Sequence, residues 1–307
     1  MASDLISFKV GEASPANTFF AIWMAQAAGL YEANGLDFHI VKMVGGSETG
    51  PALSEGRIQL MHIGMSSVVR ANAAGFDTVT IGSLSNVIRS TLFAAPGIAK
   101  ADQIKGGAVG ISSAGSESEL TTVVALEKLG LARGDVTLKE IGTLRLPPLR
   151  AGEVVATMLG EPYRSEALAA GETVLIDLLA DRIPWLYSGL VVDRSYLTDN
   201  RDAVLRFMRA TVEGNYLAVA DAAQAKPVMA RMLKISDQNN LDITYDNFKT
   251  YTPLNAEPTR EGGQAIIDTV IAAGASGTVD DYQDWSVHDD LKSEGFFEAM
   301  ARKYKVS

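Results

Sequence analysis

The residues best suited to chemistry are the hydroxyl and glycine residues of the stretch Ser112–Glu119, which reads Ser-Ser-Ala-Gly-Ser-Glu-Ser-Glu. This stretch separates a predicted strand, residues 108–111, from a predicted helix. A helix start leaves about four backbone N–H groups without partners and carries a partial positive charge. Ser113 and Ser116 would therefore help to hold a small anion there. The alternative is a serine cap with Glu119 completing a capping box, which needs no ligand.

Similar turns in the first part of the chain supply further hydroxyl and amide groups. Ser14 is a good helix cap, Pro15 takes the first helical position, and a helix is predicted from Phe19. Two helix starts that face one cleft can hold a small molecule between them. The predicted ligand contacts in these turns and in the turns of the following strands are Ser14, Asn17, Ser47, Ser66 and Ser67.

Charged and aromatic residues near other turns extend this set. Arg145 follows a predicted strand and is the best candidate for a bidentate clamp on a carboxylate or sulfonate, although most arginines only coat the surface. Glu161 and Tyr163 lie in the turn after another strand. The Glu161 carboxylate would close the lobes by pairing with a lysine or arginine, bind a ligand amine or hydroxyl, or be a solvated charge. Asn86, at the start of a predicted crossover between lobes, completes the set.

Catalytic motifs are absent from the sequence. His39, His62 and His288 are scattered without metal-ligand spacing, and His62 is better explained as a strand residue. There is no G-x-S-x-G nucleophile turn, no G-x-G-x-x-G fingerprint and no phosphate-binding loop. We therefore predict no catalytic residues, no metal site and no cofactor, and we interpret the chain as a binding protein rather than an enzyme.

An internal repeat indicates how the polar turns are positioned. The stretch 45–75 recurs as 141–171, and the offset from Gly46 to Gly142 is 96 residues. Proline opens a helix and glycine ends one in both copies. The other matched positions are Pro51 and Pro147, Leu53 and Leu149, Gly56 and Gly152, Gly64 and Gly160, and Ala73-Ala74-Gly75 and Ala169-Ala170-Gly171. Helices that alternate with apolar strands predict parallel βαβ units, and hence two similar α/β lobes.

The predicted elements follow from the hydrophobic periodicity. Strands are expected at residues 6–10, 36–44, 58–63 and 78–85 in the first lobe and at 108–111, 135–141, 154–159 and 173–176 in the second. Extended crossovers between the lobes are expected at 86–95 and 183–192. Helices are expected at 19–28, 201–222, 226–233, 245–250 and 260–273, and the tail, 280–304, is expected to pack on the first lobe.

Composition narrows the class of protein. The chain has 307 residues, of which 47% are hydrophobic and 21% charged, as in ordinary soluble proteins. The formal net charge of −10 argues against nucleic acid or an anionic membrane surface as a partner. The start of the sequence lacks the features of a signal peptide, so we expect either a cytosolic protein or a mature form without its leader. The absence of cysteine excludes disulfides and suits an oxidising compartment such as the periplasm.

A further set of motifs is spread over about residues 5–220. These motifs are Ala27-Ala-Gly-Leu-Tyr-Glu-Ala-Asn-Gly-Leu-Asp37, Ala52–Gly56, Ala101–Gly106 with Ala108–Ile111, Leu149–Glu153 and Gly160–Pro162. Together they resemble the substrate-binding proteins of ABC importers for nitrate, sulfonate, taurine and related organic anions. The wider group includes binders of thiamine-pyrimidine precursors.

The resemblance implies a two-lobed type II periplasmic-binding-protein fold with two hinge crossovers. One lobe would comprise residues 1–88 and 190–307, the other residues 89–189, with the ligand cleft between them. The implied protein is a periplasmic monomer that captures a small organic anion, a sulfonate or an aliphatic or aromatic carboxylate, and docks on a membrane permease. The alternative is an enzyme or ligand sensor on the same fold, such as a cofactor-pathway or pyrimidine-precursor protein.

Two departures from the family pattern are visible. Gln59 and Val155 stand where the family often has aspartate after the helix-stop glycine. The yeast-type pyrimidine synthase branch uses a cysteine-rich motif and a histidine, whereas this chain has no cysteine. The chain therefore fits that enzyme poorly.

Overall fold

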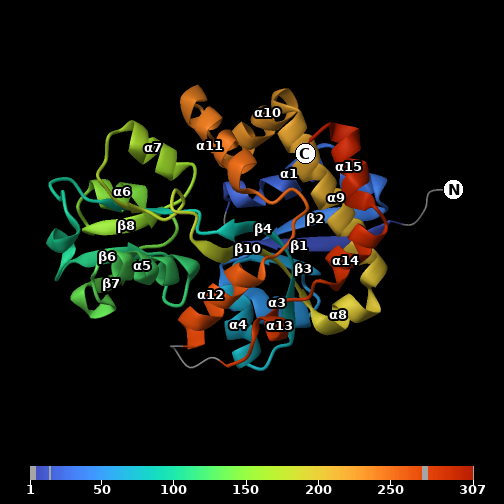
Figure 1. Ribbon diagram of the computed structural model, residues 1–307, viewed down its shortest axis with the longest axis horizontal. Helices are drawn as coiled ribbons and strands as arrows, with labels where there is room; N and C mark the ends of the chain where they lie inside the picture. The colour runs from blue at the N-terminus through green and yellow to red at the C-terminus, as the bar shows by residue number, and fades with distance from the viewer. Residues whose placement is uncertain (1–4, 14, 272–275, 307) are drawn as a thin grey trace. The chain divides into compact units, whose positions relative to one another are not determined.

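The computed structural model describes residues 5–13, 15–271 and 276–306, and the chain forms two compact units (Figure 1). Unit 1 consists of Met1–Asn86 together with Trp185–Ser307, and unit 2 consists of Val87–Pro184. The chain thus leaves unit 1 once and returns to it once. The tail that follows residue 280 belongs to unit 1, which confirms the prediction made for it.

Unit 1 is built on a five-stranded sheet with the order β2-β1-β3-β10-β4. β1 pairs in parallel with β2 and β3, and β10 runs antiparallel to β3. In β1, Phe8 and Val10 are buried while Lys9 is exposed, because successive side chains of a strand point to opposite faces. The strands are β1 (Ile6–Glu12), β2 (Leu36–Lys42), β3 (Leu60–Ile63), β4 (Thr78–Val87) and β10 (Pro184–Asp193).

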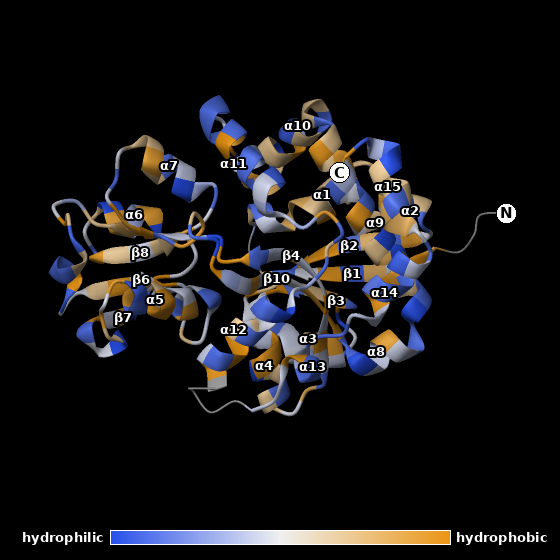
Figure 2. Cartoon of the chain, viewed as in Figure 1, coloured by the Kyte–Doolittle hydropathy of each residue, from blue (hydrophilic) through white to orange (hydrophobic). Residues whose placement is uncertain are grey.

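The helices of unit 1 cover this sheet, and the later ones come from the C-terminal part of the chain (Figure 1). Helix α14 is amphipathic: hydrophobic and hydrophilic residues alternate along it in Figure 2, and Val287 and Leu291, one turn apart, are both buried. The helices are η1 (Asn17–Phe19), α1 (Phe20–Ala27), α2 (Leu30–Ala33), η2 (Gly46–Glu48), α3 (Thr49–Ser54), α4 (Met65–Ala73), α8 (Arg194–Asp199), α9 (Arg201–Ala220), α10 (Ala222–Leu233), α11 (Gln238–Tyr251), α12 (Arg260–Ile271), α13 (Val279–Tyr282), α14 (Ser286–Ser293) and α15 (Phe296–Tyr304).

An aromatic stack joins the sheet of unit 1 to α9. The rings of Phe8 and Phe207 are stacked with centroids 5.0 Å apart, and those of Tyr31 and Phe38 are 3.7 Å apart. The Tyr31 hydroxyl lies 2.9 Å from the Thr211 hydroxyl, so its polar end is satisfied inside the core. Residues from the start of the chain and from α9 therefore form one hydrophobic core.

Helix α1 approaches α9 closely because Gly214 has no side chain. A Cβ atom at this position would lie 2.6 Å from the Ala21 carbonyl oxygen and 2.9 Å from the Ala25 Cβ. We expect Gly214→Ala to lower the free energy of unfolding by about 1–3 kcal/mol, since the two helices must separate. Urea unfolding measures this loss. The matched control is Gly134→Ala, where a Cβ meets nothing within 4 Å; an equal loss in both variants would contradict the packing argument.

Unit 2 is built on a second five-stranded sheet with the order β7-β6-β8-β5-β9. β6 pairs in parallel with β7 and β8, and β5 runs antiparallel to β8 and β9. Its elements are β5 (Thr91–Ala94), η3 (Ala101–Ile104), β6 (Ala108–Ile111), α5 (Glu117–Lys128), η4 (Arg133–Asp135), β7 (Thr137–Glu140), α6 (Leu146–Arg150), β8 (Ala156–Leu159), α7 (Tyr163–Ala169) and β9 (Val174–Asp177).

The predicted repeat is confirmed by the structure. β3 and β8 lie at the predicted offset and occupy the same place in the two strand orders. Gly56 and Gly152, which follow α3 and α6, have φ values of 68° and 70°, in the left-handed region that ends a helix. Gly75 and Gly171, which follow α4 and α7, have φ values of 93° and 73°. The two-lobed α/β fold class predicted from this repeat is therefore confirmed.

The chain passes between the units within both predicted crossovers, 86–95 and 183–192, which confirms them. The prediction of parallel βαβ units needs correction. β10, within the predicted return crossover, lies between β3 and β4, and β5, within the first crossover, lies between β8 and β9. Each enters its sheet antiparallel to a neighbouring strand. A chain that arrives from the other unit meets an edge strand with free N–H and C=O groups, and pairing satisfies them. Both sheets are therefore mixed.

Candidate functional site

In unit 2, the loop between β6 and α5 is held by its own polar groups. Ser116 is the N-cap of α5, and its hydroxyl accepts a hydrogen bond from the Glu119 N–H at 3.4 Å. The Glu119 carboxylate accepts from the Gly115 N–H at 2.5 Å, and the Ser118 hydroxyl accepts from the Ser112 N–H at 2.7 Å. The serine cap is therefore confirmed for Ser116. The predicted capping box is not formed as expected, because the Glu119 carboxylate accepts from Gly115 and the Ser116 N–H donates to the Ser113 carbonyl oxygen.

Ser113 lies in the same loop with an exposed side chain. Its carbonyl oxygen accepts a hydrogen bond from the Ser116 N–H at 3.2 Å, which tightens the turn before α5. The structure thus brings Ser113 and Ser116 together at one helix start. Their role as ligand contacts stays a prediction.

Arg145 precedes α6 and binds carbonyl oxygens of its own unit. Its Nε donates to the Met158 carbonyl oxygen at 3.0 Å, and its Nη1 donates to the carbonyl oxygens of Gly142 and Thr143, each at 3.4 Å. The guanidinium therefore ties the turn after β7 to strand β8, which lies beyond β6 in the sheet. The role of Arg145 as a clamp on an anion stays a prediction.

Glu161 is buried in an ion-pair network at the start of α7. Its Oε1 lies 3.3 Å from Arg164 Nη1, and its Oε2 accepts from the backbone N–H of Ser165 at 3.0 Å. Arg164 Nη2 also lies 2.5 Å from Asp177 Oδ2, and Arg164 Nε donates to the Thr91 hydroxyl at 2.8 Å. The pairing with an arginine that was one alternative for Glu161 is present. The partner, Arg164, belongs to the same unit as Glu161, so this ion pair lies within unit 2.

This network perturbs the titration of its members. Burial acts to raise the pKa of Asp177, but hydrogen bonds from Thr91 and Arg164 and the charge of Arg164 outweigh burial and lower that pKa. Burial likewise acts to lower the pKa of Arg164, while the carboxylates of Asp177 and Glu161 raise it. Both groups are thus held in their charged forms. The network joins β5, α7 and the end of β9.

Tyr163, next to this network, is half-buried in α7. It packs against an apolar cluster of unit 2 that includes Phe93, Leu149 and Leu159. This packing fixes the position of the ring but does not decide whether it contacts a ligand. Its predicted role in binding stays a prediction.

In unit 1, the predicted contacts gather near the ends of the parallel strands. Asn17 is 3% exposed and begins the short helix η1 before α1. Ser66 and Ser67 are buried in the first turn of α4, and a Cβ on Gly46 would lie 2.3 Å from the Ser67 hydroxyl oxygen. The turns after β2 and β3 are therefore in contact. Ser47, in the first of them, is exposed.

Asn86 has a defined structural partner in unit 1. Its Nδ2 donates to the Glu257 carbonyl oxygen at 2.8 Å, and its Oδ1 accepts from the Thr259 N–H at 3.2 Å. The side chain therefore holds the segment that leads into α12. Ser14, the remaining predicted contact, lies outside the described residues, and the roles of both in ligand binding stay predictions.

Two buried groups of unit 1 were not predicted as site residues. Glu12 ends β1 with 1% exposure, and Ser188 in β10 is 1% exposed beside the ring of His62 in β3, to which it is hydrogen-bonded. His62 is thus a strand residue, as predicted. The only sequence signal for Glu12 was a carboxylate at the end of an apolar strand, which is a weak one because glutamate is a common surface residue.

The surroundings of His62 favour its neutral form. The Phe19 ring stands edge-on to the imidazole with centroids 4.9 Å apart. Burial lowers the pKa of His62 to about 4, although a hydrogen bond with the backbone of Thr18 acts in the opposite direction. At neutral pH this edge of the sheet therefore carries no positive charge from His62.

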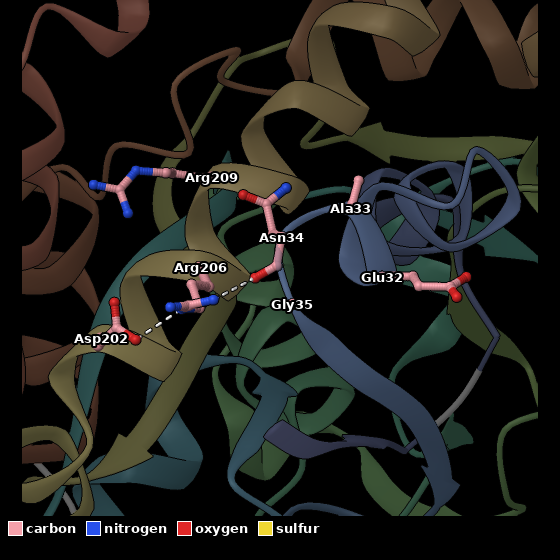
Figure 3. A pocket seen from close by; sticks show the side chains of 7 residues that line it. All are labelled: Glu32, Ala33, Asn34, Gly35, Asp202, Arg206 and Arg209. Atoms are coloured by element: carbon pink, nitrogen blue, oxygen red, sulfur yellow. Dashed lines mark hydrogen bonds and ion pairs between the residues drawn. The ribbon is translucent and has the colours of Figure 1, made fainter. Parts of the chain in front are cut away.

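A separate surface cavity of about 420 Å³ lies where β2 begins (Figure 3). Its arginines are already paired: Arg206 Nε lies 2.7 Å from Asp202, Arg206 Nη1 donates to the Asn34 carbonyl oxygen at 3.2 Å, and Arg209 lies 2.5 Å from Glu294. Open α/β folds bind ligands at the carboxyl ends of strands. This cavity lies at the opposite end of β2.

Within the described ranges, no group of three or more His, Cys, Asp or Glu side chains is placed to hold a metal ion. In the same part of the chain, no helix combines the length and the apolar character needed to cross a membrane.

Comparison with known proteins assigns the chain to a family. The protein-family model described as NMT1/THI5 like matches residues 16–225, which is more than half of the chain. The riboflavin-binding protein RibY of Chloroflexus aurantiacus is 24% identical over 234 residues. That match covers 73% of this chain and 66% of the length of RibY, so this chain spans slightly less than two thirds of that relative.

Solved structures share the fold over nearly the whole chain. The alkanesulfonate-binding protein SsuA of Xanthomonas axonopodis pv. citri, bound to MOPS, has a TM-score of 0.76 at 18% identity, covering 92% of this chain and 100% of that one. The periplasmic aliphatic sulphonate binding protein SsuA of Escherichia coli has a TM-score of 0.71 at 22% identity, covering 90% of this chain and 96% of that one. The chain belongs to the NMT1/THI5-like family and has the two-lobed α/β fold of periplasmic substrate-binding proteins.

Proposed function

We propose that this protein is the solute-binding component of an ABC importer, which captures a small organic molecule between its two units. The observation that carries the proposal is the pair of α/β units, which share one strand order and one internal repeat and are joined by two crossings of the chain. The polar turns of both units follow strands, where open α/β folds bind ligands. The family match and the fold of the sulfonate-binding relatives support the same function.

A small organic anion, either a sulfonate or a carboxylate, is the first ligand class to test. Two relatives of the same fold are named as sulfonate-binding proteins, and the Chloroflexus relative is named as a riboflavin-binding protein, which adds aromatic heterocycles to the test. The proposed contacts are Ser14, Asn17, Ser47, Ser66, Ser67, Asn86, Ser113, Ser116, Arg145, Glu161 and Tyr163.

Binding rather than catalysis is proposed for a specific reason. The imidazole and hydroxyl of His62 and Ser188 form a pair of the kind that activates a nucleophile. Because burial lowers the pKa of His62 to about 4, its imidazole is a weak base for the Ser188 hydroxyl at neutral pH. The two sulfonate-binding relatives are binding proteins by name.

The proposal includes a partner and a place of action. The loaded protein would dock as a monomer on a membrane permease in the periplasm. The net charge of −10 supports a partner other than nucleic acid, because binding to phosphate requires a basic face. Analytical ultracentrifugation tests whether the protein is a monomer, and fractionation of cells that express the native gene tests whether it is periplasmic.

Mass spectrometry of the purified protein, native and then denatured, tests the binding function directly. We expect a discrete small molecule to be released on unfolding, because closed binding proteins retain solute through purification. If the protein is empty, thermal shift with sulfonates, carboxylates, pyrimidines and flavins follows, since a ligand at about 100 times its Kd adds about 2.7 kcal/mol of stability. An empty protein that no compound stabilises would contradict the proposal.

A further inference from the structure

Glu12 is a buried carboxylate whose two oxygens differ in their partners. It ends β1 at the carboxyl edge of the unit 1 sheet and is 1% exposed. Its Oε2 is ion-paired with Lys42 Nζ, at the end of the neighbouring strand β2. Its Oε1 is buried without a hydrogen-bond partner. Buried polar atoms are nearly always hydrogen-bonded, so this oxygen requires an explanation.

Two buried donors near the same edge also lack acceptors. These are the Asn17 side-chain amide, 3% exposed, and the Trp23 indole N–H, 2% exposed. Both flank Phe19, whose ring centroid lies 5.4 Å from that of Trp23 and 4.9 Å from that of His62. Thr18, adjacent to Asn17, is hydrogen-bonded to His62 through its backbone. The loop after β1 and the start of α1 therefore pack against the end of β3.

His62 connects these donors to Glu12. Glu12 and His62 are directly paired in the parallel strands β1 and β3, so their side chains lie on the same face of the sheet. The imidazole is hydrogen-bonded to Ser188 and to the Thr18 backbone. The ring is thus engaged elsewhere, and Glu12 Oε1 remains without a donor.

The chemical types of these three atoms matter. A buried hydroxyl such as Thr49 also lacks a partner, but a hydroxyl rotates and its hydrogen position adapts. A carboxylate oxygen only accepts, and an amide or indole N–H only donates. One acceptor and two donors without partners at one edge of a sheet are complementary to a molecule that carries a donor beside acceptor atoms.

We propose that Glu12 recognises a hydrogen-bond donor on the solute and that Asn17 and Trp23 donate to its oxygen atoms. This inference rests on the proposed binding function and narrows its ligand class. The solute is a lactam-type or amide-type heterocycle with an N–H group beside carbonyl oxygens, and not a bare anion. Nitrate or an alkanesulfonate presents acceptors alone, which would be placed against the Glu12 carboxylate.

The probes are chosen in matched pairs: riboflavin with 3-methylriboflavin, and uracil with 1,3-dimethyluracil, together with ethanesulfonate and nitrate. Calorimetric titration of the wild-type protein is expected to show about ten- to a hundredfold tighter binding of the N–H member of a pair than of its methylated partner. Glu12→Met, which removes the acceptor, is expected to bring this ratio close to one.

Lys42→Met is the matched control variant. It breaks the same ion pair but keeps the Glu12 carboxylate, so we expect it to retain the preference for the N–H member. Loss of the preference in Lys42→Met would assign the effect to the ion pair and overturn the role of Glu12. Circular dichroism checks that both variants fold. The ratio of the two affinities in the wild-type protein tests the proposal even if a variant does not fold.

The possible results distinguish failure of the binding function from failure of the role of Glu12. If no probe binds, the role of Glu12 is overturned, and the binding function itself is decided by the mass spectrometry and thermal-shift experiments described above. If ethanesulfonate or nitrate binds while the N–H compounds do not, or if methylation leaves affinity unchanged, the binding function stands and the role of Glu12 is overturned. If Glu12→Met leaves the ratio of the two affinities unchanged, the role of Glu12 is also overturned, because Oε1 is then hydrogen-bonded to ordered water only.

Discussion

Replacing Arg164 by methionine is expected to lower the free energy of unfolding of unit 2 by about 3–5 kcal/mol, because it removes one partner of a buried ion network. The Arg164 side chain is 12% exposed and is paired with Glu161 and Asp177. The Glu161 side chain, 1% exposed, would lose Arg164 as its partner in the interior. Urea unfolding measures the loss, and hydrogen exchange in β5, β8 and β9 locates it.

Arg150→Met is the control for this prediction. Arg150 also joins two carboxylates of unit 2, Glu166 and Glu172, each at 2.6 Å, but its side chain is 41% exposed. Exposed pairs contribute about 0–1 kcal/mol, because water screens the charges. A similar loss in both variants would contradict the importance of burial, as would wild-type stability in Arg164→Met.

Stability is expected to fall by about 2 kcal/mol between pH 7 and pH 5 through His62 alone. The ordinary pKa of 6.5 applies to the unfolded chain, while burial lowers the pKa of His62 to about 4 in the folded protein. Between these values the unfolded chain binds a proton that the folded protein does not. Acidification therefore favours unfolding across this window, and the loss is complete below about pH 4.

His62→Gln tests this effect by the slope of stability against pH rather than by its absolute value. The slope between pH 7 and pH 5 is expected to decrease but not vanish, since burial also lowers the pKa of His288. His39→Gln is the control, because the His39 side chain is 55% exposed on β2. A wild-type slope in His62→Gln would show that protonation of His62 is not coupled to unfolding.

The repeat was predictable because its signals are local. Glycine after a helix adopts the left-handed conformation at little cost, and proline fits the first helical turn, so Gly56, Gly152, Pro51 and Pro147 mark the same boundaries in both units. Neither signal depends on distant residues. The pairing of β5 and β10 was not predictable in this way, because a strand's partners are distant in sequence.

The sequence predicted where the candidate site residues lie relative to the strands, but not which groups their side chains contact. Ser113, Ser116 and Arg145 do follow strands, as expected. The sequence offered the Ser116 cap only as one of two alternatives, and it did not indicate that Arg145 binds carbonyl oxygens. A side chain in a turn has several partners within reach, and the choice among them depends on the packing around it.

The sequence by itself determined the two similar α/β units, the order of their elements and the absence of cysteine chemistry, because periodicity, glycine, proline and composition act within a few residues of each position. Tertiary structure alone decided the mixed sheets, the pairing of Arg164 with Glu161 and Asp177, and the isolation of Glu12 Oε1. These features join residues far apart in the chain. Burial decides the strength of their interactions, and burial is a property of the folded protein.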